Sequence, residues 1–378
     1  MKESTLPSSR AKLDSIPQQI TCVQDYSELA KQYIDHPSYE YISAGSGNEQ
    51  TLQANHTAFN HIAIYNRLLV DCSQGNTKGQ ILGTPIAHPI LLAPVAFQKL
   101  VHPQGELETV RAAEATQTPM IVSTLSSTSL EQIAQQAPAQ LWFQLYFQPQ
   151  RAHTLDLVRR AEAAGYRTLV VTLDASIQAS NRRAQKAGFV FPEQVSPQNL
   201  VHYPVPVQKQ LQPDSSIIFQ GMMGDAPNWQ DLAWLRQQTQ LPILVKGVLH
   251  PQDALQLMEM GINGVVVSNH GGRALDGVPA ALQALPAIRE ALGQSATILM
   301  DGGIQSGYHV FKALACGADA VLLGRPQLYS LAVAGALGVA HMIRLLTEEL
   351  QLCMALAGCP TLDHIDQNCI FSSKPGGE

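Results

Sequence analysis

A base and a cation stand three residues apart in residues 265–277, which read VVVSNHGGRALDG. Three valines are followed by polar residues, by His270, by two glycines and then by Arg273. Histidine exchanges protons near neutral pH, arginine carries a permanent positive charge, and glycine allows the backbone to turn closely. A base, a flexible backbone and a cation at the exit of a buried strand indicate a catalytic site.

Polar side chains also close the other apolar runs of the chain. Strand ends are wetter than strand centres, which explains some of these positions. It explains poorly the Gln-x-Tyr inside LWFQLY and the lysine that closes PILVK. We therefore expect the polar side chains to converge on one rim. They are Ser123, Gln144, Tyr146, Thr172, Asp174, Lys246, Ser268 and Asp301.

The apolar runs predict the fold. Each is short, apolar throughout and stopped by a polar or glycine-rich turn, as buried parallel strands are. Helix-like segments fill most of the intervals. Eight such strands alternating with helices predict an α/β chain folded as a (β/α)8 TIM barrel, in which active sites lie at the C-terminal ends of the strands. The runs are 90–94, 120–124, 141–146, 168–174, 242–247, 264–270, 297–303 and 320–325.

Three segments lie outside the barrel, which we place at residues 90–366. Residues 1–89 form an expected N-terminal extension packed on the barrel, with helical stretches around 26–34 and 49–59. Residues 177–228 form a long insertion after the fourth strand, rich in Pro, Gln and Ser, and irregular segments of this length are often lids. We expect this lid to lack a strongly apolar anchor. Residues 367–378 are a C-terminal tail.

Glycines follow the seventh and eighth strands, in MDGGI at 300–304 and LLGRP at 322–326. Backbone N–H groups approach a phosphate closely only where side chains are absent, so the pattern predicts a phosphate ligand. Tight turns between strand and helix are the alternative explanation. Flavin mononucleotide (FMN) fits such a site, since its ring edge offers hydrogen bonds to the polar rim. Lys246 would suit the negative edge of the reduced ring, or it forms a structural ion pair with Asp301.

The chain resembles the FMN-dependent (S)-2-hydroxy acid oxidase and dehydrogenase family, which includes glycolate oxidase and lactate oxidase. The pattern SNHGGR at 268–273 followed by LDGVPA at 275–280 is close to the family signature. Further matches are YEYISAG at 39–45, HPQGE at 102–106, WFQLY at 142–146, PILVKGV at 242–248, DGG at 301–303 and FKALACGADAV at 311–321. They run in order from about Tyr39 to Asp366.

The resemblance implies a role for each matching residue. His270 would take a proton from the substrate, and Asp174 would pair with the imidazolium. Arg273 and Arg182 would hold the substrate carboxylate, while Tyr41 and Tyr146 would contact its carboxylate and hydroxyl. The matching flavin positions are Pro94, Val95, Ala96, Ser123, Gln144, Thr172, Lys246, Ser268, Asp301, Gly303, Gly324 and Arg325.

Four positions depart from the family pattern. A one-residue insertion in SNRRAQ makes Arg182 the candidate second arginine and Arg183 the runner-up. Gln305 stands where the family has an arginine for the FMN phosphate, which leaves Arg325 as the main cation there. Val95 replaces a threonine or alanine beside the flavin. Leu125 replaces a tryptophan of glycolate oxidase-like members, so the substrate pocket differs.

The resemblance implies oxidation of a small (S)-2-hydroxy acid to the 2-oxo acid, with electrons returned to oxygen to give hydrogen peroxide. L-lactate is the favoured substrate, because LDASIQASNR is nearer to lactate oxidase-like sequences. Alternatives are a dehydrogenase that passes electrons to a quinone or another carrier, a non-catalytic FMN-binding relative, and a phosphosugar isomerase or aldolase on the same barrel. Homotetramers or higher oligomers are also implied.

Composition narrows the classes of partner. The 378 residues carry a net charge of −6 with scattered basic residues, which gives no reason to expect nucleic acid or an anionic membrane as partner. The six cysteines form no C-x-x-C pair or ligand-like cluster, so we expect reduced thiols and no metal site. The N-terminal residues lack the apolar core of a signal peptide, and the longest apolar run, 331–340, is too short to span a bilayer. We expect a cytoplasmic protein.

Overall fold

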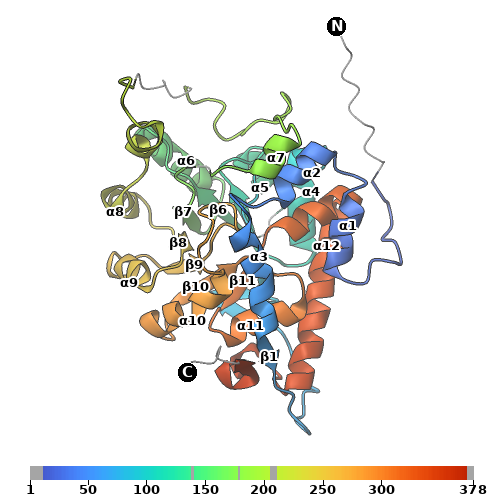
Figure 1. The fold of residues 1–378 in the computed structure, drawn as a ribbon. Helices are drawn as coiled ribbons and strands as arrows, with labels where there is room; N and C mark the ends of the chain where they lie inside the picture. Colours follow the sequence, from blue (N-terminus) through green and yellow to red (C-terminus); the bar gives the residue numbers. More distant parts are fainter. Residues whose placement is uncertain (1–11, 138–139, 178, 205–210, 373–378) are drawn as a thin grey trace.

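The computed structural model describes residues 12–137, 140–177, 179–204 and 211–372. At its centre, eight parallel strands form a closed barrel in the order β10-β11-β4-β5-β6-β7-β8-β9. Strands of this barrel, β6 to β11 among them, are labelled in the middle of Figure 1. Each strand coincides with one of the eight apolar runs, with β8 extending one residue beyond its run to Val248, so the predicted barrel is confirmed. The strands are β4 (Ile90–Leu92), β5 (Met120–Ser123), β6 (Leu141–Leu145), β7 (Leu169–Thr172), β8 (Ile243–Val248), β9 (Gly264–Val267), β10 (Thr297–Asp301) and β11 (Ala320–Leu323).

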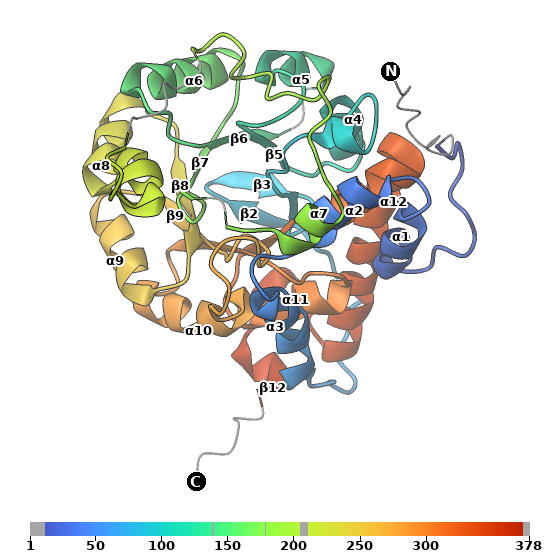
Figure 2. The same ribbon diagram turned by 45° about the horizontal axis from the view of Figure 1, so that its top comes forward.

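Helices surround the barrel and cover the outer face of its strands (Figure 2). They follow the strands along the chain, as the alternation of the sequence predicts. They are α4 (Glu106–Ala115), α5 (Leu130–Gln136), α6 (Arg151–Ala163), α8 (Trp229–Gln238), α9 (Pro251–Glu259), α10 (Ala281–Leu292), α11 (Gly307–Ala315) and α12 (Arg325–Ala357).

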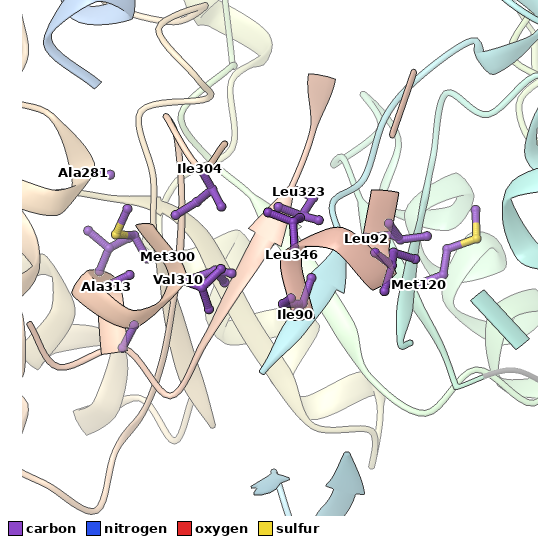
Figure 3. Close-up of a cluster of buried hydrophobic side chains, with 14 of the residues drawn as sticks. Ile90, Leu92, Met120, Ala281, Met300, Ile304, Val310, Ala313, Leu323 and Leu346 are labelled. Atoms are coloured by element: carbon purple, nitrogen blue, oxygen red, sulfur yellow. The ribbon is translucent and has the colours of Figure 1, made fainter. Parts of the chain in front are cut away.

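Side chains of the barrel strands alternate between an outer and an inner face. The outer set packs against the helices, and Figure 3 shows part of it, with Ile90 and Leu92 from β4 and Val310 and Leu346 from helices. The inner set begins with an apolar layer of Leu91, Ile121, Trp142, Val170, Leu244, Val266, Leu299 and Leu322. Two residues further along, the same inner positions hold Ala93, Ser123, Gln144, Thr172, Lys246, Ser268, Asp301 and Gly324. The period of two therefore stacks the polar rim directly on the apolar layer.

A hairpin that the sequence did not predict packs into the barrel interior. Strands β2 (Gly79–Ile81) and β3 (Thr84–Ile86) pair antiparallel, and Ile81 and Ile86 join the inner apolar layer. In Figure 2 the hairpin is seen through the centre of the ring of strands. The hairpin contacts the apolar layer, and the polar layer lies on the other side of it. The hairpin therefore closes the end of the barrel opposite the polar rim.

Residues 23–61 of the N-terminal extension are mostly helical, with boundaries that differ from those expected. Its helices are α1 (Val23–Ala30), α2 (His36–Ser43) and α3 (Gln50–Thr57), followed by a short 3-10 helix, η1 (Ala58–His61). The helix expected around 26–34 ends at Ala30, because a second helix starts at His36 with Asp35 as its N-cap and Pro37 in its first turn. A strand from the tail, β12 (Ile370–Ser372), pairs antiparallel with β1 (Ile62–Ile64).

Helix α12 is the longest helix, with 33 residues, and it bends where Ala334 and Gly335 leave the helical conformation. By length and composition alone it could cross a membrane, but 61% of its most apolar window is buried inside the fold. It packs against α1, α4 and α11. This burial is that of a core helix.

The insertion after β7 contains the short helix α7 (Arg182–Lys186) and a π-helical turn, η3 (Ile217–Met222). Its apolar side chains Ile217, Ile218, Phe219, Met222 and Met223 are exposed, Phe219 by 71%. These side chains form a short exposed apolar run, and the expectation that the lid lacks a strongly apolar anchor stays a prediction. Shorter 3-10 helices are η2 (Gln98–Leu100), η4 (Met223–Asp225), η5 (Leu362–His364) and η6 (Gln367–Cys369).

Candidate active site

His270 and Asp174 form a hydrogen-bonded pair at the exits of β9 and β7. The Nδ1 atom of His270 lies 2.8 Å from Oδ1 of Asp174. An ionised carboxylate can only accept, so Nδ1 carries the hydrogen and Nε2 is the basic nitrogen of the neutral ring. Burial opposes ionisation of Asp174, but the charge of Lys246 and the interaction with His270, which includes its hydrogen bond, outweigh burial and hold the pKa of this carboxyl below its ordinary value. The pair is thus arranged to accept a proton at Nε2.

The loop after β9 turns in the left-handed region, with φ of 58° at His270, 62° at Gly271 and 77° at Gly272. A side chain on Gly272 would lie 2.6 Å from the backbone N of Leu52 in α3. Left-handed backbone costs an ordinary residue about 1–2 kcal/mol, so two glycines ease the turn and His270 alone carries the strain. This explains the order His-Gly-Gly-Arg in the sequence.

A bulge in β8 makes room for Asp174. The pairing of β8 with β9 shifts between Lys246 and Val248. Gly247 lies between them with φ of 105°, and a Cβ there would stand 2.4 Å from the Cβ of Asp174. Only glycine permits this approach. Gly247 directly follows the predicted lysine, but its role could not be predicted from the sequence.

Lys246 lies in the polar layer, with Nζ 2.7 Å from Oγ of Ser268 and 3.0 Å from Oδ2 of Asp301. The structural ion pair considered from the sequence is therefore present. Burial disfavours the charge, but Asp301 and Asp174 outweigh it and raise the pKa of Lys246 above its ordinary value. Lys246 therefore stays positively charged. Thr172 pairs with it in the adjacent strand.

Gln144 presents an unpaired amide in the polar layer. Its Oε1 accepts hydrogen bonds of 3.2 Å from Oγ of Ser123 and from the backbone N–H of Thr124. Its Nε2 is buried and, among the described residues, has no hydrogen-bond partner. Buried polar atoms without partners are uncommon and mark ligand positions. The amide and the nearby Lys246 Nζ fit the carbonyl-bearing edge of the expected flavin ring.

The phosphate end of the expected cofactor would lie at the exits of β10 and β11. A Cβ on Gly324 would meet nothing within 4 Å, so space remains before the N-terminus of α12. The N-terminus of a helix attracts anions. Glycine is required at position 303 for a different reason, because a Cβ there would lie 2.1 Å from the carbonyl oxygen of Asn55 in α3. The site fits an FMN phosphate at Gly324, while the glycine at 303 is required by packing.

Arg325 is placed differently from the expectation that it mainly serves the phosphate. It donates to the carbonyl oxygens of Ile42, Ala44 and Gly271 at 2.9–3.0 Å. Burial lowers the pKa of Arg325 to about 10, and the nearby Arg273 adds to the shift. The guanidinium therefore joins the end of α2 to the catalytic loop, and a role toward phosphate stays a prediction.

Arg273 uses the same carbonyls. Its Nη1 donates to the carbonyl oxygens of Tyr41, Ile42 and Ala44 at 2.8–3.2 Å. Positive charge is favourable at a helix C-terminus, where carbonyls lack partners. Among the described residues the other guanidinium nitrogens of Arg273 make no hydrogen bond. That edge is the one available to a carboxylate.

The two predicted tyrosines lie beside this arginine. The guanidinium of Arg273 lies 5.0 Å from the ring centre of Tyr41. The ring of Phe189, from the lid, also stacks on the Tyr41 ring, with 4.3 Å between the ring centres. Burial raises the pKa of Tyr146 to about 12, with further influence from Lys246 and Asp174. Tyr146 therefore stays protonated and is a hydrogen-bond donor.

Arg182 is not brought to this cluster. It is exposed on α7, and its Nη1 donates to Oδ1 of Asn48 at 2.6 Å. Arg183 instead pairs with Glu40 of α2 at 2.9 Å. Both arginines line a cavity of about 200 Å³ between α7 and the loop before α3. The second carboxylate-binding arginine stays a prediction.

The loop after β4 brings Pro94, Val95 and Ala96 to the rim, all three half-buried. Val95 packs against the core. Phe97, which follows Ala96, donates its backbone N–H to the carbonyl of Leu125 at 3.1 Å, so the loops after β4 and β5 lie side by side. The two family departures, Val95 and Leu125, therefore stand on neighbouring loops.

Gln305 stands between the phosphate loop and α11. Its backbone N–H donates to Nδ1 of His309 at 3.3 Å, and the His309 ring stacks on Phe59 at 4.2 Å. Burial lowers the pKa of His309 to about 4, so this ring is neutral near pH 7. Neither Gln305 nor the neutral His309 therefore provides a positive charge beside the phosphate loop.

Buried polar residues that the sequence analysis overlooked hold the rim in place. Asn55 of α3 and Asn269 of the catalytic loop exchange two hydrogen bonds. Glu106 is 1% exposed and accepts hydrogen bonds from the loops after β4 and β5. Asn199, at the root of the lid, donates to the carbonyls of Ser123 and Thr124. HPQGE at 102–106 pointed to Glu106, whereas no local pattern distinguishes the asparagines.

Comparison with known proteins agrees with this geometry. A model of the FMN-dependent dehydrogenase family matches residues 30–372. An L-lactate oxidase of Alicycliphilus denitrificans is 52% identical over 95% of this chain and 99% of its own length. An L-lactate oxidase of a Nostoc species is 43% identical over 90% and 95% of the two chains. A solved mandelate oxidase variant with (S)-mandelic acid has a TM-score of 0.85 and 36% identity, covering 94% of this chain and 99% of its own.

Proposed function

The chain belongs to the family of FMN-dependent dehydrogenases, and on that premise we propose that it oxidises a small (S)-2-hydroxy acid, with L-lactate preferred, to the 2-oxo acid. FMN, when bound, takes up two electrons from the substrate and passes them to oxygen, which leaves as hydrogen peroxide. The names of the two relatives support L-lactate, since both are L-lactate oxidases.

The His270–Asp174 pair carries the proposal. In the neutral ring Nε2 is the free basic nitrogen, so it takes a proton from the substrate. The imidazolium that results lies 2.8 Å from the carboxylate of Asp174, which stabilises its positive charge. Asp174 also fixes the ring orientation, because it holds Nδ1. His270 thus acts as the base, and Asp174 is the group that orients it.

Substrate binding falls to the side chains beside the base. The unoccupied edge of Arg273 can bind both oxygens of a carboxylate. Tyr146 donates a hydrogen bond, and Tyr41 lies under the same guanidinium. Arg182 lies on the lid, hydrogen-bonded to Asn48, and its role as the second carboxylate-binding arginine stays a prediction.

The experiment that tests the proposal is anaerobic mixing of the purified yellow protein with L-lactate, glycolate and L-mandelate. We expect loss of the flavin absorbance, fastest with L-lactate, and hydrogen peroxide on return of oxygen. A parallel assay with an artificial dye compares oxygen with other acceptors. His270→Ala is the control: it should keep the flavin and lose reduction by roughly 100-fold or more. Unchanged absorbance with every acid would refute the proposal.

We further propose a homotetramer or larger oligomer in the cytoplasm. The resemblance to the family supports the oligomer, and the composition of the chain supports the location. Light scattering of the flavin-loaded protein measures the assembly directly, and a monomer would contradict it.

A further inference from the structure

A pair of thiols lies far along the chain from the catalytic residues, where α12 gives way to β12. The Sγ atoms of Cys359 and Cys369 are 3.6 Å apart. Both thiols point at one acceptor, the carbonyl oxygen of His364, at 3.4 Å each. Two donors that share an acceptor are held together, so the contact is built into the backbone of this segment.

The end of α12 explains why the two sulfurs meet. Gly358 adopts φ of 70°, its N–H donates to the carbonyl of Ala355, and the N–H of Cys359 donates to that of Met354. This Schellman arrangement reverses the chain and turns Cys359 inward. Two 3-10 helices, η5 and η6, then return the chain so that Cys369 lies against it. Strand β12 starts at the next residue and pairs with β1.

The two thiols differ in access. Cys369 is partly exposed, whereas Cys359 is buried to 2% exposure. Cys359 also lines a cavity of about 230 Å³, together with Cys72 and Met354. Burial, together with the neighbouring Cys369 thiol, raises the pKa of Cys359 to about 12. Cys369 is therefore the thiol that meets an oxidant first, and Cys359 is the one that resolves it.

We propose that Cys359 and Cys369 are a modification site that hydrogen peroxide converts to a disulfide. The thiol of Cys369 gives up its proton and its sulfur attacks one peroxide oxygen, the O–O bond breaks, and the hydroxide that leaves takes up that proton, so the products are a sulfenic acid and one water. The sulfur of Cys359 then attacks the sulfenic sulfur, a second water leaves, and the S–S bond forms. Sulfur loses two electrons in total, and the peroxide is reduced by two. The sulfurs must approach by about 1.5 Å to reach a normal S–S bond.

The oxidant is the product of the oxidase reaction itself. The bond would close the loop between residues 359 and 369 and tie the start of β12 to the end of α12. Cross-linking stabilises a fold mainly by restricting its unfolded chain. The modification would therefore strengthen the β1–β12 closure under the conditions in which the enzyme makes peroxide.

The test uses the full-length, FMN-loaded protein, reduced and then freed of reductant. Added hydrogen peroxide tests the thiol pair without relying on the oxidase activity, and turnover of L-lactate in air tests the source. We expect wild type to lose two of its six titratable thiols. Cleavage at Asp363 and Asp366 should leave two fragments joined only by the disulfide, and fragmentation should assign Cys359 and Cys369. The oxidised protein should also unfold at a higher temperature.

Three variants provide the controls. Cys369→Ser should keep its remaining five thiols, and Cys359→Ser should stop at a sulfenic acid that dimedone labels at Cys369. Cys72→Ser removes a different thiol beside the same cavity, so it should still lose two. Retention of all thiols by wild type, or a linkage to another cysteine, would overturn the proposal. If added peroxide forms the disulfide but turnover of lactate does not, the proposed thiol site is supported and the proposal that this chain produces hydrogen peroxide is contradicted.

Discussion

The amide side chains of Asn55 and Asn269 exchange two hydrogen bonds, of 2.8 and 2.9 Å, in the interior of the protein. Each asparagine is only 2% exposed. Asn55 belongs to the N-terminal extension, and Asn269 immediately precedes His270. The backbone carbonyl of Asn55 also faces Gly303. One buried pair therefore joins the extension to the base and to the phosphate loop.

Replacement of Asn55 by Ala should weaken both the fold and the site. It removes both hydrogen bonds between the two buried amides and leaves Asn269 only its bonds to Pro279 and Gly272, which costs about 2 kcal/mol. We expect a lower midpoint of thermal unfolding, weaker FMN retention and a lower kcat, because the loop that carries His270 loses its anchor. Calorimetry and flavin release on dilution measure these effects. Thr57→Ala, on the exposed side of the same helix, should change neither property.

Gly247→Ala should disable the base. The added methyl group would stand 2.4 Å from the Cβ of Asp174, so the carboxylate must move away from His270. We expect kcat to fall by roughly 100-fold while the protein still folds. Gly165→Ala is the matched control, since a Cβ there meets nothing although its φ of 85° is also positive. Equal activity of the two variants would contradict this prediction, because it would show that the methyl group and Asp174 avoid each other without moving the carboxylate from His270.

Asp174→Asn separates the charge of this residue from its size. Loss of the negative charge removes the stabilisation of the imidazolium, so kcat should fall. The pH profile of kcat/KM should also change, because it no longer reports a histidine paired with a carboxylate. The pKa of Asp174 is held below 3.8, so its ionised form stabilises the fold fully above that pH. This contribution is lost as pH falls through the lowered pKa. Acid unfolding of wild type and variant should therefore converge below pH 3.8.

Arg273→Lys and Arg325→Lys should have different effects, although both arginines bind the end of α2. Lysine cannot offer a carboxylate two parallel hydrogen bonds, so Arg273→Lys should raise KM for the hydroxy acid more than it lowers thermal stability. Arg325 is half-buried and donates to three carbonyls, so Arg325→Lys should chiefly lower the unfolding temperature and FMN retention. Steady-state kinetics and thermal unfolding of each variant, measured together, distinguish these outcomes. A large KM effect from Arg325→Lys alone would contradict the assignment.

Much of the fold could be predicted because it rests on local periodicity. Each barrel strand reads as an apolar run, and its inner face repeats every second residue. The step from Val266 to Ser268, or from Trp142 to Gln144, places a polar residue directly above an apolar one. That period holds in any strand of a parallel sheet. The pairing of His270 with Asp174 was expected from the family resemblance, not from the spacing of the two residues.

Only the tertiary structure decided what depends on contacts between distant segments. Helix α2 receives its last hydrogen bonds from Arg273 and Arg325, more than two hundred residues later. The glycine at 247 is required by Asp174, and the glycine at 303 by Asn55. Cys359 and Cys369 meet because the chain reverses twice between them. A sequence states which groups are present along the chain, but which of them touch is set by packing, where partners come from separate elements.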